Sequence, residues 1–376
     1  MVCDHAWFDK NPKKTIVIVS LLLFSLVDFL FAMHSLNDET RYRIRSDIYH
    51  HGLAPNKSIT RAQWGPKFYS LNTNSLGFKD HIAKYINVNS KYYRILFIGD
   101  SFAEGVGVEY EKTFVGIIAN ELAKKDIEVL NASASSYSPI IYLTKIKYLI
   151  EYVGLKFDEL IVFLDISDIQ DEVKYYIFDE NYHVIDNDAM VEKEEERGFD
   201  NCSHLGKERI LDRYLRKVKK FTMLTRTVIT IIENFFENPN PFFRQTSCST
   251  NLRRAMWTLD NAMYEEYGMV GLEKSKEHLS SLLRLLKNHG IKLTLAVYPW
   301  PDQIINHDLH SRHVAFWQEW AIENNVNFLN YFPHFINERN REEILETYFI
   351  PGDIHWNATG HQLIARIFLN SYRPGE

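Results

Sequence analysis

The sequence of 376 residues predicts an α/β protein built on a doubly wound parallel sheet. Apolar runs of strand length alternate with stretches of helical periodicity from about residue 93 to about residue 371. Apolar residues make up 45% of the chain, which is enough for a sizeable core. Polar motifs follow the apolar runs at their carboxyl ends, where ligands bind in sheets of this kind.

Each element of the alternation has its own signal in the sequence. The expected strands are the apolar runs Tyr93–Ile98, Ile127–Leu130, Leu160–Leu164, Lys292–Tyr298 and Val326–Tyr331. The expected helices are Lys112–Lys125, Ile140–Val153, Leu272–His289, His310–Asn324 and Ala358–Ser371. We therefore expect a five-stranded, flavodoxin-like parallel sheet with helices on both faces.

Near its start, the chain contains a segment typical of a membrane anchor. Thr15–Met33 is an apolar run of the length that spans a bilayer, and it follows Lys13 and Lys14. A cleaved signal peptide is the alternative, but the run is long for a signal and the cleavage site is poor. We expect a cytoplasmic tail over residues 1–14, a single transmembrane helix over residues 15–33, and the rest of the chain outside the cytoplasm.

The remainder of the chain divides by composition. Residues 34–92 form a polar connector, expected to be turn-rich and to pack on the domain of residues 93–376. An insertion at about residues 172–268 interrupts the alternation, with an acidic run followed by a basic amphipathic stretch, and predicts a helical cap. The cap packs on the sheet domain or touches a membrane surface. Cys202 and Cys248 in this insertion form a disulfide if the region is exported, or are two unrelated thiols.

The stretch Gly99-Asp100-Ser101 follows the first strand and precedes a helix. A serine at this position projects its hydroxyl at the carboxyl edge of the sheet. Near the end of the chain, the stretch Asp353-Ile-His355-Trp-Asn-Ala-Thr-Gly-His precedes the last helix. Asp353 and His355 would complete a set of nucleophile, base and orienting carboxylate.

These two motifs, in this order and context, resemble those of the SGNH/GDSL hydrolase family over roughly residues 93 to 371. The resemblance implies acyl transfer through a serine ester. By motif position it makes Ser101 the nucleophile, His355 the base and Asp353 its orienter. It implies neither a cofactor nor a metal.

Two other motifs of the family are altered in this chain. Ser133 stands where the family has a glycine whose backbone N–H stabilises the oxyanion, and Ser167 stands where it has an asparagine with the same task. The resemblance implies an oxyanion hole formed by Ser101, Ser133 and Ser167. The loss of one donor lowers the rate by about 10²–10³, so weak activity is expected if the serines replace the usual donors poorly.

The remaining observations concern the ligand. Tyr298 and Trp300 follow the fourth strand and either line a substrate pocket, where aromatic faces suit sugar rings, or form a buried turn. The net charge of −6 gives no sign of the basic surface that nucleic-acid-binding proteins carry. We expect a membrane-anchored serine esterase or O-acyltransferase acting on an acylated cell-envelope glycan. The alternative is a catalytically silent relative that binds glycan or scaffolds an envelope complex.

Overall fold

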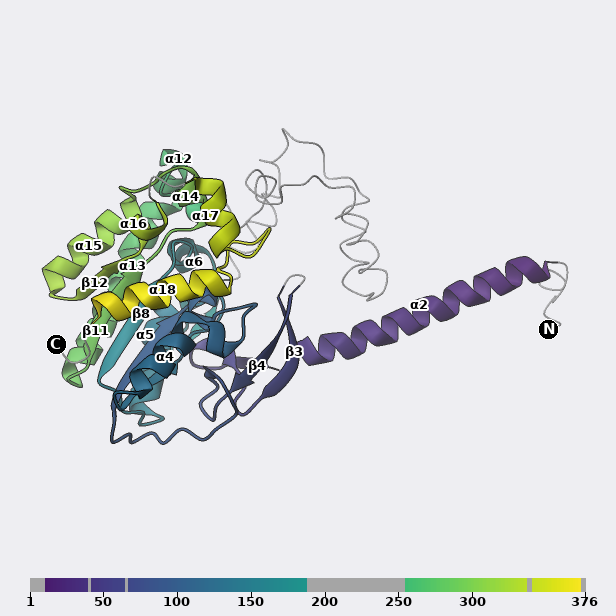
Figure 1. The fold of residues 1–376 in the computed structure, drawn as a ribbon, viewed down its shortest axis with the longest axis horizontal. Coiled ribbons are helices and arrows are strands. Elements are labelled where there is room, and N and C mark those ends of the chain that lie inside the picture. The colour runs from purple at the N-terminus through teal and green to yellow at the C-terminus, as the bar shows by residue number, and fades with distance from the viewer. Residues whose placement is uncertain (1–10, 40–41, 65–66, 188–253, 337–339, 373–376) are drawn as a thin grey trace. The chain divides into compact units, whose positions relative to one another are not determined.

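A computed structural model describes residues 11–39, 42–64, 67–187, 254–336 and 340–372 of the chain. The chain divides into two units, one comprising Met1–Arg41 with Phe199–Asn240 and the other Tyr42–Gly198 with Pro241–Glu376. The described part of the first unit is the helix α2 (Pro12–Glu39). The second unit contains the sheets and the other described helices (Figure 1).

The centre of the second unit is a five-stranded parallel sheet with the order β12-β11-β8-β6-β7. The strands are β6 (Tyr93–Gly99), β7 (Ile127–Asn131), β8 (Glu159–Leu164), β11 (Lys292–Val297) and β12 (Asn327–Asn330). In order along the chain this is the 2-1-3-4-5 arrangement of a flavodoxin-like sheet. The predicted fold is therefore confirmed, with strand boundaries within about two residues of those expected from the sequence.

The sheet is apolar because it is buried on both faces. Ile95 to Ile98 of β6 and Leu160 to Leu164 of β8 have no exposed surface. Continuous apolar runs of this kind are typical of parallel strands covered by helices. Burial of each such side chain contributes about 1.5–3 kcal/mol relative to its exposure to water.

Helices connect these strands and follow the last one. They are α3 (Ser101–Glu104), η1 (Tyr110–Lys112), α4 (Phe114–Ala123), α5 (Pro139–Glu151), α6 (Asp168–Lys174), α12 (Asn261–Met263), the π-helical turn η3 (Tyr264–Gly268), α13 (Met269–Asn288), α14 (Pro301–Ile305), α15 (Arg312–Asn324), α16 (Phe332–Phe335), α17 (Arg341–Tyr348) and α18 (Ala358–Ser371).

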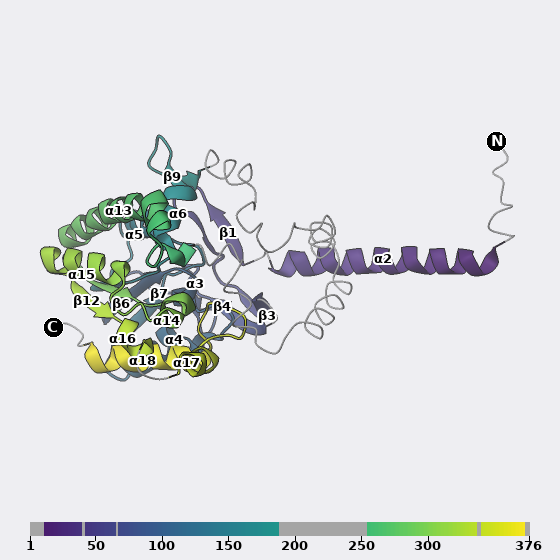
Figure 2. The same ribbon diagram turned by 90° about the horizontal axis from the view of Figure 1, so that it is seen from above.

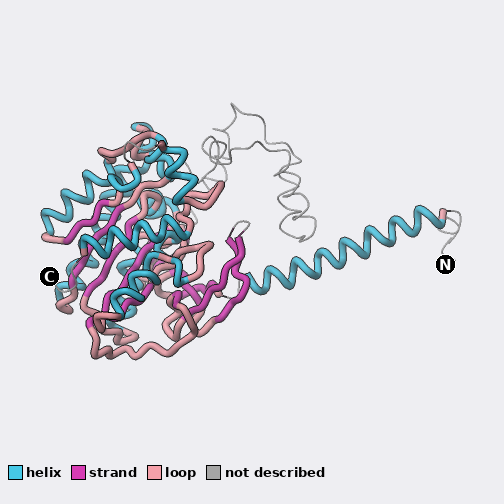
Figure 3. Tube along the Cα trace, in the orientation of Figure 1, coloured by secondary structure: helices cyan, strands magenta, loops and turns pink. Residues whose placement is uncertain are grey.

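The helices form a layer on each face of the sheet. Figure 2 shows α5, α13 and α15 on one side and α4 and α18 on the other. In Figure 3, viewed at right angles to Figure 2, helices of one layer cross in front of the strands. The sheet is therefore doubly wound, and its carboxyl edge, where β6, β7 and β8 end, is the edge that carries the sequence motifs.

The connector contains more regular structure than the expected turns. The strands β1 (Arg43–Ser46) and β2 (His50–Leu53) form an antiparallel hairpin. The strands β3 (Ser58–Trp64), β4 (Lys67–Thr73) and β5 (Lys79–Asp80) form a second, antiparallel sheet. Turns join these strands, as expected. The strands themselves were not predicted, because they are short and alternate irregularly between buried and exposed residues.

The expected anchor segment is helical and belongs to α2. Along Ile16–Leu30 its large apolar side chains are exposed. Within the part of the chain that the structure describes, no helix meets the length and apolarity of a membrane span.

Much of the insertion, including Cys202, Cys248 and the basic helical stretch, lies outside the described residues. Its described part includes a two-stranded antiparallel ribbon, β9 (Tyr176–Phe178) with β10 (Val184–Asp186).

Candidate active site

Ser101 is the first residue of α3, immediately beyond the end of β6. Asp100 caps this helix, with its Oδ1 accepting the backbone N–H of Phe102 at 2.9 Å. Gly99 is required here because a Cβ atom would lie 2.8 Å from both the Phe163 carbonyl oxygen and the Ala103 Cβ. The glycine thus allows the turn to pass tightly over β8 and place Ser101 at the carboxyl edge of the sheet.

The loop between α17 and α18 supplies two more polar side chains. His355 Nε2 lies 2.8 Å from Ser101 Oγ, and His355 Nδ1 lies 2.5 Å from Asp353 Oδ1. The backbone of the loop is closed by a hydrogen bond from Ile350 N–H to the His355 carbonyl oxygen at 2.8 Å. Ser101 is 8% exposed and His355 is 6% exposed, so both residues are largely buried.

The rest of the terminal motif holds this loop in place. Asn357 caps α18 by accepting the backbone N–H groups of Thr359 and Gly360. A Cβ atom on Gly360 would lie 2.2 Å from the Tyr348 carbonyl oxygen, so only glycine fits this approach. His361 packs in the interior, where burial lowers its pKa to about 3, and its Nδ1 accepts the Phe114 backbone N–H.

Trp64, at the end of β3, was not expected at this site. Its Nε1–H donates to Asp353 Oδ2 at 2.9 Å, and its ring lies edge-on to the His355 ring with centroids 5.0 Å apart. The sequence signal was weak, because Trp64 is an isolated aromatic residue about 290 positions before its partner. Only the folded connector brings it to the site.

Asp353 is held as a carboxylate by these donors. Burial acts to raise its pKa, but the hydrogen bonds from His355 and Trp64 outweigh this and the net pKa lies below the ordinary value. The charge fixes a proton on His355 Nδ1, which leaves Nε2 free to accept a proton from Ser101.

Ser133 and Ser167 lie on either side of Ser101, because β7 and β8 flank β6 in the sheet. The Ser133 N–H donates to the Asn131 side chain at 3.1 Å, and the Ser133 hydroxyl is buried without a partner among the described residues. The backbone N–H expected for the oxyanion hole is therefore already bonded. The Ser133 hydroxyl is thus the donor without a partner in the described part of this structure, and the expected role of the Ser133 backbone in the oxyanion hole stays a prediction.

Ser167 is in a similar position. Its backbone N–H donates to Asp165 Oδ1 at 2.6 Å. Its side chain is 2% exposed and makes no hydrogen bond to the described residues. The hydroxyl is therefore available to a ligand, as the motif position implied.

Tyr298 and Trp300 are interior residues rather than walls of a pocket. They are at most 1% exposed, and both donate to Asp165 Oδ2, the Tyr298 hydroxyl at 2.9 Å and the Trp300 Nε1–H at 2.8 Å. The expected substrate-facing role is corrected to the buried turn, because these polar tips complete a hydrogen-bond network below Ser101.

Residues of the connector also hold the elements around Ser101. Arg43 forms a two-armed ion pair with Glu104 of α3 at 2.9 and 3.0 Å, and Glu104 accepts the Ser135 backbone N–H at 2.7 Å. His51 Nε2 donates to the Ser135 carbonyl oxygen at 2.7 Å. Lys79 is fully buried, which lowers its pKa to about 8, and donates to the Gly105 carbonyl oxygen at 2.6 Å. The serine loop and the loop after β7 are thus fixed to the same hairpin and sheet.

The fold and the contacts among Ser101, His355 and Asp353 define an α/β protein with a serine–histidine–aspartate arrangement. No protein-family model and no curated protein matches the sequence. Solved structures that resemble the chain include esterases and a member of the lipolytic G-D-S-L family, the family that its two motifs resemble.

Three of these structures illustrate the likeness. The esterase EstA from Pseudoalteromonas sp. is 13% identical, with a TM-score of 0.36 over 74% of this chain and 95% of that one. The acetyl xylan esterase AlAXEase is 12% identical, with a TM-score of 0.41 over 74% of this chain and 100% of that one. The G-D-S-L family protein from Veillonella parvula is 14% identical, with a TM-score of 0.37 over 74% of this chain and 98% of that one.

Proposed function

We propose that this protein is a serine esterase of the SGNH type that works through a Ser101 acyl-enzyme. The observation that carries the proposal is the hydrogen-bonded line from Ser101 Oγ through His355 to Asp353, with contacts of 2.8 and 2.5 Å. Nucleophile, base and orienter are recognised by this geometry and not by their order in the chain.

The chemistry follows from the contacts. His355 Nε2 takes the proton of Ser101 as Oγ attacks the acyl carbonyl, and Asp353 stabilises the imidazolium that forms. His355 then returns the proton to the leaving alcohol, which leaves an ester on Ser101. Water attacks this ester in the second half of the cycle, with His355 again as the base. Hydroxyl donors from Ser133 and Ser167 would stabilise the oxyanion in both halves.

A fluorophosphonate probe tests the proposal directly. The parent protein should be labelled on Ser101, and Ser101→Ala should lose both labelling and hydrolysis of short acyl esters while keeping its circular dichroism spectrum. Ser371→Ala, an exposed serine on α18, is the matched control and should be labelled like the parent. Labelling of Ser101→Ala at the parent rate would refute the assignment.

We further propose an O-acyltransferase activity on an acylated envelope glycan, with α2 as the membrane anchor. Hydrolysis and transfer share the acyl-enzyme and differ in whether water or a sugar hydroxyl accepts the acyl group. Exposed apolar side chains along α2 support the membrane part. Ester turnover measured with and without sugar acceptors would test transfer, and protease accessibility on intact cells would test the anchor and its orientation. If the domain is protected from protease on intact cells, it lies inside the cell. An envelope glycan is then excluded as its substrate.

One observation favours the silent alternative, a glycan-binding or scaffold protein. The Ser133 backbone N–H is bonded to the Asn131 side chain, and Ser167 stands where the family has an asparagine side-chain donor, so two donors of the oxyanion hole are altered. A silent protein would leave Ser101 unlabelled by the probe and would still retain acetylated oligosaccharides in a binding measurement. Labelling of Ser101 decides between the two functions.

A further inference from the structure

The contacts of the Ser101 hydroxyl require one more proton than the serine carries. Ser101 Oγ lies 2.8 Å from His355 Nε2 and 3.1 Å from Asp100 Oδ2. One hydroxyl has one proton and can donate to only one of these acceptors. If Ser101 gives its proton to His355, as the reaction requires, the contact with Asp100 must be made by a proton of the Asp100 carboxyl.

The two oxygens of Asp100 have different surroundings. Oδ1 accepts the Phe102 backbone N–H at 2.9 Å and lies 3.1 Å from the Tyr298 hydroxyl. Oδ2 contacts the Ser101 hydroxyl. Since a donor points at Oδ1, Oδ2 is the oxygen that can carry a proton. Asp100 therefore accepts a hydrogen bond from Phe102 through Oδ1 and can donate one to Ser101 through Oδ2.

Asp165, the neighbouring carboxyl, has the opposite pattern. It accepts the Trp300 indole N–H at 2.8 Å, the Tyr298 hydroxyl at 2.9 Å and the Ser167 N–H at 2.6 Å. Three donors favour the charged form of a carboxyl group. Both oxygens of Asp165 accept donors, whereas Asp100 Oδ2 contacts only the serine hydroxyl among the described residues, so the hydrogen bonds favour a proton on Asp100.

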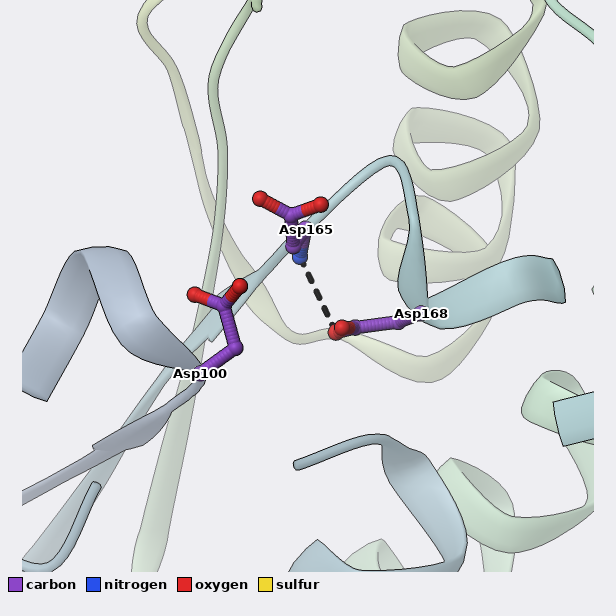
Figure 4. A group of neighbouring side chains, drawn as sticks. All are labelled: Asp100, Asp165 and Asp168. Carbon is purple, nitrogen blue, oxygen red and sulfur yellow. Dashed lines mark hydrogen bonds between the residues drawn. The ribbon is translucent and has the colours of Figure 1, made fainter. Parts of the chain in front are cut away.

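The wider surroundings do not supply a cation to Asp100. Oxygens of Asp100, Asp165 and Asp168 lie within 4.8 Å of one another, all buried (Figure 4). No lysine or arginine of the described residues donates a hydrogen bond to these three carboxyls. Arg254 acts on Asp165 by its charge but is paired with Asp171, with 2.5 Å between Nη2 and Oδ2.

The other titratable groups that face this cluster are neutral donors or the base itself. Tyr142 donates to Asp168 Oδ2 at 2.6 Å, Tyr298 lies between Asp100 and Asp165, and His355 contacts Ser101. Burial first, and the charge of Asp165 second, raise the pKa of Asp100 well above its ordinary value. The pKa shift therefore agrees with the proton count.

We propose, on the basis of the serine esterase function above, that Asp100 is a neutral carboxylic acid that donates a hydrogen bond from Oδ2 to Ser101 Oγ. Asp100 keeps its proton throughout, and no bond to it forms or breaks. At rest it turns the serine hydroxyl toward His355 Nε2. When the acyl-enzyme breaks down, the bond between Oγ and the acyl carbon breaks and Oγ takes a proton from His355. The Asp100 donor stabilises the negative charge that develops on Oγ during that step.

Asparagine has the same hydrogen-bond pattern as a neutral aspartic acid in this position. In Asp100→Asn, Oδ1 can accept the Phe102 N–H and Nδ2 can donate to Ser101, and the α3 cap is kept.

Asp100→Ala should lower the fluorophosphonate labelling rate by about tenfold or more, on the scale of a lost donor. Asp100→Asn should restore most of that rate. The parent should lose labelling at high pH as Asp100 ionises, and Asp100→Asn should lack this loss.

Asp158→Asn is the matched control, because Asp158 is exposed and bonds to Arg94 at the amino end of the same sheet. Its labelling rate and pH profile should follow those of the parent. If Asp100→Asn is as slow as Asp100→Ala while both keep the parent's circular dichroism spectrum, the carboxylate form is required and the proposal is overturned.

A second measurement does not depend on activity. An Asp100 that stays protonated in the folded state, while the unfolded chain ionises, makes the parent lose stability as pH rises above about 4. Relative to Asp100→Asn, the folding equilibrium constant of the parent should fall by about tenfold per pH unit over that range. Identical pH dependence of urea unfolding in the two proteins would overturn the proposal. Absence of probe labelling in the parent would instead refute the esterase function, and the unfolding comparison would still decide the state of Asp100.

Discussion

The indole of Trp64 and the carboxylate of Asp353 are joined by a hydrogen bond of 2.9 Å, although they come from opposite ends of the sequence. The connector thereby contributes to the serine–histidine–aspartate line. His355 Nδ1 and the His355 backbone N–H donate to Asp353 Oδ1, and the Trp64 indole N–H donates to Asp353 Oδ2. The carboxylate is held at both oxygens, which fixes the plane in which it meets the imidazole.

Loss of the indole donor should slow catalysis without unfolding the protein. Trp64→Phe keeps an aromatic ring beside His355 but leaves Asp353 Oδ2 without this donor. We expect the labelling rate of Ser101 to fall by about tenfold, which corresponds to about 1.4 kcal/mol of barrier. Phe68→Leu, an exposed aromatic residue on β4 of the same sheet, should label normally. If Trp64→Phe is labelled at the parent rate, the indole N–H does not contribute to catalysis and the Trp64 side chain acts through packing alone.

Asp353 gives a pH-dependent prediction. Because its folded pKa lies below the ordinary value, the stability it contributes is present above the unfolded pKa of about 4 and is lost as pH falls through the folded pKa. Asp353→Asn should be less stable than the parent at neutral pH, and the difference should shrink in acid. The variant should also lose about 10³–10⁴ in turnover, because the amide favours the wrong histidine tautomer. Urea unfolding at several pH values, with ester kinetics, measures both effects; a constant stability difference down to strong acid would contradict the first.

Ser167 is expected to act on the transition state. Ser167→Ala removes a hydroxyl that has no partner among the described residues, so the fold should tolerate it. We expect kcat to fall by roughly tenfold to a thousandfold with little change in KM, because the donor acts mainly on the developing oxyanion. Ser167→Asn should keep or raise activity if the longer side chain fits. Steady-state kinetics on a short acyl ester tests this, and an unchanged kcat in Ser167→Ala would exclude the hydroxyl from the oxyanion hole.

The ion pair between Arg43 and Glu104 should stabilise the domain strongly. Glu104 has no exposed side-chain surface, and Arg43→Met would leave its charge without the two-armed partner. Loss of one partner of a buried pair typically lowers the free energy of unfolding by about 3–5 kcal/mol. The double variant Arg43→Met/Glu104→Met should recover part of this loss, because no unpaired charge is then buried. Chemical denaturation of the three proteins tests the prediction; equal stability of Arg43→Met and the parent would contradict it.

The sequence predicts the central sheet because each of its strands is a short apolar run between helices. Ser101, His355 and Asp353 could be named for a similar reason: their motifs lie at strand and helix ends, and the topology brings those ends together. The sequence left open whether Tyr298 and Trp300 line a pocket or form a buried turn, because an aromatic residue after a strand gives no indication whether its polar tip faces solvent or a buried carboxyl. Trp64 was missed because its importance depends on the path of an irregular antiparallel sheet, which has no clear periodic pattern.

The contacts of Arg43, Trp64 and Lys79 also set a limit on where the protein can be divided. A fragment that begins at Tyr93 would contain all five strands of the parallel sheet together with Ser101, Asp353 and His355. It would still expose the fully buried Glu104 without its arginine and leave the Gly105 carbonyl without the Lys79 donor. The shortest fragment suited to crystallisation or assay therefore starts near Tyr42, where the second unit begins.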